Sequence, residues 1–207
     1  MAKAPDHDLV FVFDVAGVLV EWNLEALYGP LCERSGRDLE HIANHVLGSS
    51  TQAKISKGEP VMPLLQRLIR QYPEWEDEIL AYWARWDEML VDVISGSIAV
   101  VEELKERGHR LHVLGNWGRG EFERARPRMP FLELFNGVLL SGDCGLLKPD
   151  TEIYALAERQ FKLVPEKTVF IDDRKENVLA AISRGWNGIV FEDPRQLYLT
   201  LMNYGML

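Results

Sequence analysis

The sequence is poor in several features that would point to particular classes of protein. It has two cysteines in 207 residues, Cys32 and Cys144, and they form no CxxC pair and no Cys/His cluster. This excludes a disulfide framework or a zinc site as the basis of the fold. No apolar run approaches the ~20 residues that cross a bilayer, and residues 1–8 lack the apolar stretch of a signal peptide. We therefore expect a cytoplasmic protein without a membrane partner.

Basic side chains are also scarce relative to acidic ones. The chain has 23 Lys and Arg against 32 Asp and Glu, which gives a formal net charge of -9. Nucleic-acid binding depends on clusters of Lys and Arg, so we expect no nucleic-acid partner. Repeats and low-complexity tracts are absent as well, and the length is typical of one domain or one domain with an insertion.

Short apolar runs that alternate with helical patterns define the expected core. The runs are rich in β-branched and aromatic residues, which is typical of strands covered on both faces. They lie at residues 9–13, 111–114, 138–140, 168–171 and 188–191. Helical patterns separate the later runs, at residues 97–107, 150–161 and 176–184. This order predicts an α/β fold with a Rossmann-like, mostly parallel sheet flanked by helices.

Residues 24–93 interrupt the alternation of strands and helices. This segment has several helical patterns and no clear strand. We therefore expect an all-helical cap inserted after the first strand, about the size of a helical bundle. Residues 1–23 and 94–207 would then form the Rossmann-like core.

An aromatic stripe within the expected cap has the spacing of one helix face. It consists of Trp75, Ile79, Tyr82 and Trp86. We interpret the stripe as the interior of the inserted bundle. The alternative is that one of these tryptophans, or Arg85, faces a substrate.

Polar residues follow the predicted strands at the point where each strand ends. In open parallel sheets, ligands bind beyond the carboxyl ends of the strands. The residues found there are, in chain order, Asp14, Gly115, Asn116, Asp172 and Asp173, and the run at 138–140 leads through residues 141–147 to Lys148. We therefore expect three carboxylates and one ammonium group at one rim of the sheet.

This set of charges predicts a metal site. Three neighbouring carboxylates raise one another's pKa, so a divalent cation is the natural neutraliser, and all-oxygen ligation is typical of Mg²⁺. Lys148 would keep Asp14 ionised and offer a positive charge to a phosphate. An ionised carboxylate beside a metal is a candidate nucleophile toward phosphorus. Taken singly, each Asp also fits a turn or helix cap.

Four segments occur in a characteristic order: FDVAGVLV at 13–20, VLGNW at 113–117, Lys148-Pro149, and VFIDDRKEN at 169–177. Together they resemble the four motifs of the haloacid dehalogenase superfamily of hydrolases. The helical insertion is similar in position to that family's C1-type cap. Among the subgroups, the chain most resembles sugar-phosphate phosphatases and epoxide-hydrolase N-terminal-domain-like phosphatases, which often carry a Trp where Trp117 stands.

The resemblance implies a role for each matching residue. Asp14 would be the nucleophile that forms an aspartyl-phosphate, and Lys148 would be the partner of the phosphate and of the nucleophile. Asp14 and Asp173 would bind Mg²⁺ through their side chains, Asp172 would be a second or outer ligand, and Ala16 would contribute its backbone carbonyl. The implied activity is hydrolysis of a small phosphorylated substrate.

Two positions depart from the family pattern. Ala16 stands where its phosphatases usually have an Asp that serves as general acid and base, a loss worth about 10²- to 10⁴-fold in rate. Gly115 stands where a Ser or Thr hydroxyl binds phosphate, which leaves backbone N–H groups and the Asn116 side chain. We therefore expect a weakened phosphatase that favours good leaving groups, as in anomeric sugar, acyl or aryl phosphates.

Other functions remain open at this point. A halocarboxylate dehalogenase also lacks the Asp at Ala16, but it works without metal and has a Ser/Asn-rich fourth motif, unlike Asp172-Asp173. A non-catalytic binding or regulatory protein with this fold would explain both Ala16 and Gly115. A receiver domain would place its acidic pair after the first strand, and the glycines of residues 115–120 have the wrong spacing for a dinucleotide fingerprint.

The remaining features carry less functional weight. His41 and His45 lie one helical turn apart, but Ile42 replaces the glutamate of an HExxH motif, so we expect an exposed cap face. Residues 197–202 predict a terminal helix that docks on the core or forms a dimer contact. The sequence is thus compatible with a monomer or a homodimer.

Overall fold

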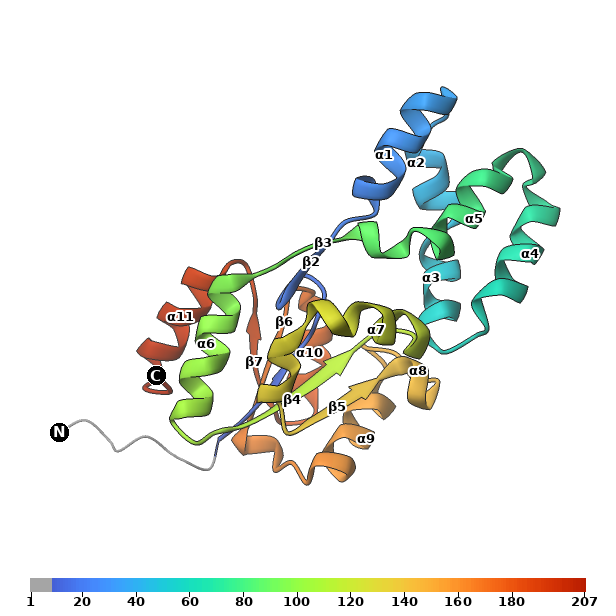
Figure 1. Cartoon of the computed structure of the whole chain (residues 1–207). Helices are drawn as coiled ribbons and strands as arrows, with labels where there is room; N and C mark the ends of the chain where they lie inside the picture. The colour runs from blue at the N-terminus through green and yellow to red at the C-terminus, as the bar shows by residue number, and fades with distance from the viewer. Residues whose placement is uncertain (1–8) are drawn as a thin grey trace.

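The core of the molecule is a five-stranded parallel sheet (Figure 1). The computed structural model describes residues 9–207. The strands lie in the order β5-β4-β1-β6-β7. They are β1 (Val10–Phe13), β4 (Arg110–Gly115), β5 (Gly137–Leu140), β6 (Thr168–Asp172) and β7 (Asn187–Val190). Every predicted core strand forms, and the α/β class is confirmed.

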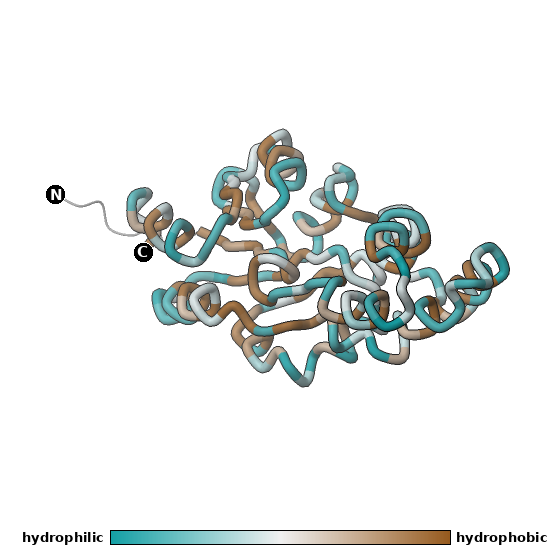
Figure 2. Tube along the Cα trace, turned by 90° about the horizontal axis from the view of Figure 1, so that it is seen from above, coloured by the Kyte–Doolittle hydropathy of each residue, from teal (hydrophilic) through white to brown (hydrophobic). Residues whose placement is uncertain are grey.

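Helices cover both faces of this sheet. They are α6 (Ser95–Glu106) and α11 (Pro194–Asn203) on one face, and α9 (Thr151–Phe161) and α10 (Lys175–Ser183) on the other. In β1, Phe11 and Phe13 pack toward α6 and α11, while Val10 and Val12 pack toward α9 and α10. Figure 2 shows this apolar interior as brown strands between helices with teal outer faces. Burial on both faces explains why the strand sequences are apolar rather than alternating.

The chain leaves the core after β1 and returns to it before α6. A two-stranded antiparallel sheet, β2 (Val20–Trp22) with β3 (Leu90–Val93), connects the core to the helices between them. These are α1 (Leu24–Ser35), α2 (Leu39–His41), η1 (Ile42–Val46), α3 (Ser49–Ser56), α4 (Val61–Gln71), η2 (Pro73–Trp75), α5 (Glu76–Ala84) and η3 (Trp86–Met89). Figure 1 shows α1 to α5 set apart from the sheet.

Strand β3 corrects the expectation that residues 24–93 contain no strand. It has four residues, of which Val91 and Asp92 are exposed and only Leu90 is buried, so it gives no apolar run. It is a strand because it pairs with β2, and its own sequence gives no signal of this pairing. The division into a cap of residues 24–93 and a core remains a prediction.

The aromatic stripe of the cap is distributed over three short helical segments. Trp75 ends η2, Ile79 and Tyr82 lie on α5, and Trp86 begins η3. All four side chains are buried, and they belong to the cluster that continues into the core. Their burial agrees with an interior stripe, although the residues do not share one helix. His41 stacks on the Trp75 ring at 5.2 Å between centroids, and His45 is exposed.

The remaining core helices follow β4, β5 and α9. They are α7 (Arg119–Ala125), η4 (Arg126–Arg128), η5 (Pro130–Leu134), α8 (Ser141–Cys144) and η6 (Pro165–Lys167). Cys32 is buried and Cys144 half-buried, and both are free thiols as expected. Within residues 9–207, no helix is long and apolar enough to cross a membrane. The expectation about a signal peptide falls on residues 1–8, outside the described residues.

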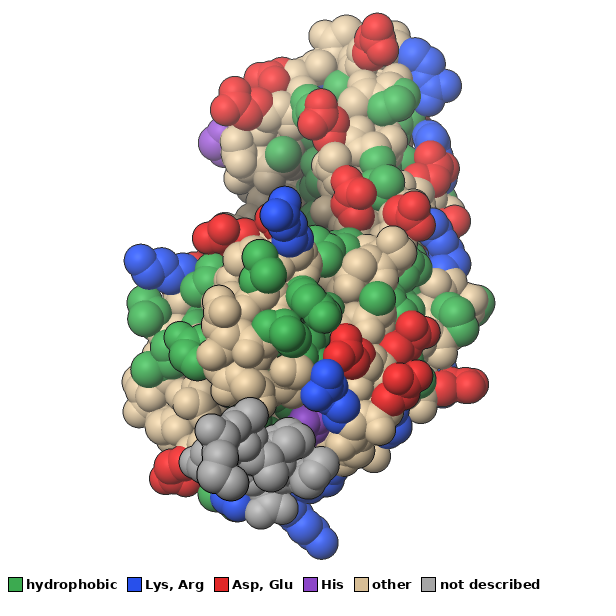
Figure 3. All heavy atoms as spheres, turned by 90° about the vertical axis from the view of Figure 1, so that its left-hand side faces the viewer, with side chains coloured by type: hydrophobic (Ala, Val, Ile, Leu, Met, Phe, Trp, Pro, Cys, Tyr) green, Lys and Arg blue, Asp and Glu red, His purple; other side chains and the backbone are tan. Residues whose placement is uncertain are grey.

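The C-terminal helix docks on the core as predicted. Leu197 and Leu201 of α11 are fully buried against the sheet and α6. The outer side of α11 exposes Tyr198, Leu199 and Met202. Figure 3 looks onto this face and shows hydrophobic side chains gathered there, with acidic side chains spread over the core and cap.

Candidate active site

Asp14 begins the site, directly after the central strand β1. Its N–H still donates to the Ile171 carbonyl at 2.9 Å, so the sheet fixes its backbone. Its side chain is buried, and Oδ1 accepts the Val15 N–H at 2.7 Å. Lys148 Nζ lies 2.8 Å from the same oxygen. These contacts give the carboxylate a single orientation.

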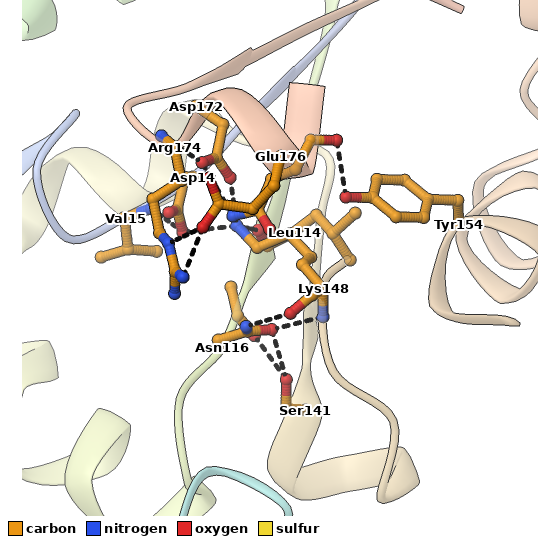
Figure 4. Close-up of polar contacts among 12 residues, drawn as sticks. Asp14, Val15, Leu114, Asn116, Ser141, Lys148, Tyr154, Asp172, Arg174 and Glu176 are labelled. Carbon is orange, nitrogen blue, oxygen red and sulfur yellow. Dashed lines mark hydrogen bonds and ion pairs between the residues drawn. The ribbon is translucent and has the colours of Figure 1, made fainter. Parts of the chain in front are cut away.

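The Lys148 ammonium is enclosed by three oxygens. Nζ donates to Asp14 Oδ1, to Asp172 Oδ2 at 2.7 Å and to the Leu114 carbonyl at 2.7 Å (Figure 4). Its side chain is fully buried. An ammonium has three donors, and all three are engaged here. In this geometry Lys148 orients and neutralises Asp14, and its predicted contact with phosphate stays a prediction.

Asp172 and Asp173 follow β6 but lie in different surroundings. Asp172 is fully buried, and its Oδ1 accepts the Arg174 N–H and the Asn177 side-chain N–H, each at 2.9 Å. Asp173 is exposed and lines the pocket. One carboxylate oxygen from each of Asp14, Asp172 and Asp173 lies within 4.8 Å of the others. The structure thus brings together the three carboxylates that the sequence placed at one rim.

Burial and mutual repulsion act on the protonation of these groups. Burial raises the pKa of Asp14, the Lys148 charge opposes this, and the Asp172 charge adds to it. Burial also raises the pKa of Asp173, again with help from the charge of Asp172. For Lys148, burial favours loss of the proton, but the two carboxylates outweigh it and raise its pKa. A divalent cation at the three carboxylates would relieve this excess of negative charge.

A tight turn after Asp14 shapes the floor of the site. The Leu19 and Val20 N–H groups both donate to the Val15 carbonyl, at 2.8 and 3.0 Å. Gly17 has a φ of +80°, and a Cβ at this position would lie 2.6 Å from Asp173 Oδ2. A side chain is therefore excluded both by the backbone conformation and by the neighbouring carboxylate.

The turn after β4 is joined to the Lys148 segment through Asn116. The Asn116 side chain accepts the Lys148 N–H at 2.8 Å and donates to the Lys148 carbonyl at 2.9 Å. Ser141 Oγ donates to the same side-chain oxygen at 2.9 Å. Asn116 therefore holds the backbone that carries Lys148, and its predicted role in substrate binding stays a prediction.

Packing does not require a glycine at position 115. A Cβ there would meet the Val15 side chain at 3.4 Å and Asp14 Oδ1 at 3.9 Å, which are ordinary contacts. The Cβ of the Ser or Thr that the resemblance leads one to expect would thus meet no clash here. Gly115 leaves backbone N–H groups as the donors that this turn offers to an anion.

A cavity of about 520 Å³ opens above these residues. Its core wall includes Asp14, Ala16, Lys148, Asp173 and Arg174. Its remaining wall is mostly aromatic or comes from the cap, with Trp22, Ser49, Gln52, Ser56, Tyr82, Trp86 and Trp117. The volume lies in the range of pockets that hold a small organic molecule. Two stripe residues, Tyr82 and Trp86, thus both fill the cap interior and reach the pocket.

Sequence reasoning missed a buried acid in this pocket. Glu121 of α7 is 5% exposed, and it accepts the Tyr82 hydroxyl on Oε1 and the Gly118 N–H on Oε2. Its spacing of three residues from the helix cap Gly118 is a capping-box pattern, the one local signal for this placement. Arg85, the other candidate for a substrate-facing role, instead pairs with Glu88 at the surface.

Comparison with known proteins identifies the family. The model of the haloacid dehalogenase-like hydrolases matches residues 9–185, which is most of the chain. The protein belongs to this family of hydrolases, as the four motifs led us to expect.

Three relatives give the context of this assignment. The sesquiterpene phosphatase astK of Aspergillus oryzae is 28% identical over 186 residues, covering 88% of this chain and 89% of that protein. The HAD family enzyme bt-2542 of Bacteroides thetaiotaomicron, solved with magnesium and inorganic phosphate, superposes with a TM-score of 0.71 at 17% identity, covering 89% and 94%. A HAD-like hydrolase of Porphyromonas gingivalis gives 0.71 at 21%, covering 93% and 97%. At these identities the two structures establish the shared fold.

Proposed function

We propose that the protein is a magnesium-dependent phosphomonoester hydrolase that acts through an aspartyl-phosphate on Asp14. The observation that carries this proposal is the placement of Asp14, which lines the pocket, is held by Lys148 at 2.8 Å and is grouped with two further carboxylates. The phosphatase and the magnesium and phosphate complex among the relatives support it. The Asp172-Asp173 pair speaks against a metal-free dehalogenase.

The donor set fits Mg²⁺. Three carboxylates supply hard oxygen atoms within 4.8 Å of one another, and burial raises the pKa of Asp14 and of Asp173, which a cation would counter. Asp14, the exposed Asp173 and the Ala16 carbonyl would hold the ion. Asp172 would act from behind them, since its oxygens already accept from Lys148, Arg174 and Asn177. When bound, Mg²⁺ neutralises charge on the transferring phosphoryl group.

The contacts of Asp14 indicate which oxygen attacks. Val15 and Lys148 both bind Oδ1, so Oδ2 is the oxygen left for phosphorus. Oδ2 forms the new P–O bond, the bond to the alcohol breaks, and the departing alkoxide takes a proton from water because Ala16 carries none. Water then attacks the aspartyl-phosphate, which releases phosphate and returns Asp14 to its carboxylate form.

The pocket favours an apolar alcohol part. Trp22, Trp86 and Trp117 line the space beyond the carboxylates. These rings gain free energy when they cover apolar surface of the alcohol part. Together with the sesquiterpene phosphatase among the relatives, this supports a terpenoid-type or aromatic phosphate monoester as the substrate.

Phosphate release from a panel of esters tests the function. The panel contains an aryl phosphate, an isoprenyl monophosphate, a sugar 1-phosphate and glycerol phosphate, each assayed with Mg²⁺ and with EDTA. We expect the aryl and isoprenyl esters to be fastest, EDTA to abolish turnover, and Asp14→Asn to lower it at least about a thousand-fold.

Four outcomes would contradict the proposal or part of it. Activity that is indifferent to Asp14→Asn would remove the aspartyl-phosphate, and halide release from a halocarboxylate without metal would identify a dehalogenase. No turnover in the native protein, with activity appearing only in Ala16→Asp, would favour the non-catalytic interpretation. Faster hydrolysis of glycerol phosphate than of the aryl ester would refute the assignment of the leaving group.

A further inference from the structure

Glu121 joins the cap to the turn that carries the second motif. On one side, Tyr82 of cap helix α5 donates its hydroxyl to Glu121 Oε1 at 2.5 Å. On the other side, the Gly118 N–H donates to Oε2 at 3.2 Å. Hydrogen bonds to a carboxylate are among the stronger ones in proteins, and these two are buried. One carboxylate therefore binds two parts of the chain that are 36 positions apart in sequence, residues 82 and 118.

A second bond ties the same turn to another cap helix. Ser56 at the end of α3 donates its hydroxyl to the Asn116 carbonyl at 3.0 Å. The backbones also approach closely here, because a Cβ on Gly118 would lie 2.8 Å from the Ile55 carbonyl and 2.6 Å from Glu121 Oε2. Residues 116–118 are thus enclosed by the cap on one side and by Glu121 on the other.

The same turn holds the lysine that contacts the proposed nucleophile. The Asn116 side chain makes two hydrogen bonds to the Lys148 backbone, and Lys148 Nζ reaches Asp14 Oδ1. The contacts therefore run without a gap from Tyr82 and Ser56 through the turn and Lys148 to Asp14. Each step is a hydrogen bond or ion pair of 3.2 Å or less, apart from the covalent path from Gly118 to Asn116.

We propose that Glu121 is a positioning residue that couples docking of the cap to the placement of Lys148 and Asp14. This rests on the proposed phosphatase function for its catalytic consequence, while its structural consequence stands without it. The coupling ensures that the nucleophile is held in its reactive orientation when the cap lies over the pocket and excludes water. Burial raises the pKa of Glu121, and the hydrogen bonds from Tyr82 and Gly118 oppose this rise.

Capping of α7 is the simpler role that the test must separate from coupling. As a cap, Glu121 would serve its own helix and be indifferent to Tyr82. As a positioning residue, Glu121 and Tyr82 act through one bond, so their effects would not add. The variants are Glu121→Gln, Tyr82→Phe and the double mutant. The control is Glu123→Gln, an equal change at an exposed position of the same helix, where the side chain pairs with Arg119.

The first readout is amide hydrogen exchange in the full-length protein, which requires no activity. In both single variants we expect the Lys148 N–H to exchange about tenfold faster or more, the effect of losing one hydrogen bond to a charged group. The double mutant should exchange no faster than the faster single variant. Glu123→Gln should stay within about twofold of the native protein. Faster exchange confined to Gly118 would overturn the proposal and leave only helix capping.

The second readout is steady-state hydrolysis of an aryl phosphate with Mg²⁺. We expect kcat to fall about tenfold in each single variant, with KM changed less than about threefold, and no further fall in the double mutant. Multiplicative losses, or a kcat that stays native, would overturn the coupling. If the native protein releases no phosphate, the phosphatase function fails while the exchange result still decides the coupling. If Glu121→Gln fails to fold, Tyr82→Phe carries both readouts.

Discussion

The two walls of the pocket are built in different ways. On the core side, Lys148 meets three oxygens and Asp172 meets three donors, all on segments that the sheet holds in place. On the cap side, the wall combines the rings of Tyr82 and Trp86 with polar side chains such as Gln52, and it reaches the motif-two turn through the hydroxyls of Ser56 and Tyr82. The core wall is therefore organised by strand topology, and the cap wall by a few docking contacts.

This difference separates two tasks. Charged groups that must act on phosphorus need fixed distances, and fully engaged hydrogen bonds supply them before any ligand arrives. Selection of the alcohol part needs shape and apolar area, which the rings of Trp86 and Trp117 provide at a centroid distance of 5.5 Å. Substitutions on the core wall should therefore cause large losses of stability and activity. Substitutions on the cap wall should cause smaller, graded changes.

The largest expected effect comes from removing the charge at the centre of the core wall. Lys148→Met leaves Asp14 and Asp172 buried without their cation, which should lower the free energy of unfolding by about 3–5 kcal/mol. Urea unfolding followed by circular dichroism measures this loss. Added Mg²⁺ should recover part of it, because the ion takes over the neutralisation.

Lys175→Met is the matched control for this prediction. Lys175 lies at the start of α10, a helix that covers the parallel sheet, and its side chain is exposed to solvent. Its replacement should change the free energy of unfolding by less than about 0.5 kcal/mol. Equal effects of the two substitutions would show that the core wall is no more rigidly built than the surface.

The core wall was also the part that sequence could predict. Asp14, Asp172 and Asp173 stand where strands end, Lys148 follows β5 and α8 along the chain, and a parallel sheet brings strand ends to one rim. Their partners were harder to foresee. That Lys148 donates to the Leu114 carbonyl, or that Asn116 grips the Lys148 backbone, depends on loop conformations rather than on residue spacing.

The sequence did not predict which residues form the cap wall, and the reason is physical. The stripe from Trp75 to Trp86 has the period of one helix, yet the helix is interrupted at Trp75, where φ is −106°, and again at Arg85, where φ is −126°. Which rings then reach the pocket depends on how short helices pack. Glu121 has only a capping-box spacing as a local signal, and its contact with Tyr82 is a tertiary one. Strand β3 was missed because its partner, not its own sequence, makes it a strand.

The next effect concerns Ala16, where the core wall lacks a proton donor. Ala16→Asp places a carboxyl at the pocket floor and should raise kcat for alkyl phosphates on the order of a hundred-fold, with a smaller gain for aryl phosphates. The ratio of the two gains is the measurement. An equal gain for both esters would mean that protonation of the leaving group does not limit the native enzyme.

The third prediction compares a buried and an exposed histidine in their effect on stability in acid. His112 of β4 is 4% exposed, stacks on Phe161 at 4.2 Å between centroids and has no hydrogen-bond partner within residues 9–207. Burial, with the charges of Arg110 and Lys105, lowers its pKa to about 4. The unfolded chain binds this proton near pH 6.5, so stability falls as the pH drops from 6.5 toward 4.

Urea unfolding between pH 7 and pH 4 measures this dependence. The native protein should lose roughly 2 kcal/mol more than His112→Leu over this interval, because the variant has no proton to bind. His45→Leu, at an exposed position of the cap, should keep the native pH dependence. Parallel curves for the native protein and His112→Leu would show that the buried imidazole is not the acid-sensitive group.

The smallest expected effect lies at the junction of core and cap. Arg128 of η4 donates to the carbonyls of Asp87 at 2.9 Å and Val91 at 3.2 Å, and its side chain is exposed to solvent. Because water replaces exposed hydrogen bonds at little cost, Arg128→Ala should lower the free energy of unfolding by less than about 1 kcal/mol and raise KM for an aryl phosphate no more than about twofold. Steady-state kinetics with Mg²⁺ measures the change in KM. A tenfold rise would show that this surface contact, rather than the hydrogen bonds of Ser56 and Tyr82, holds the cap wall over the carboxylates.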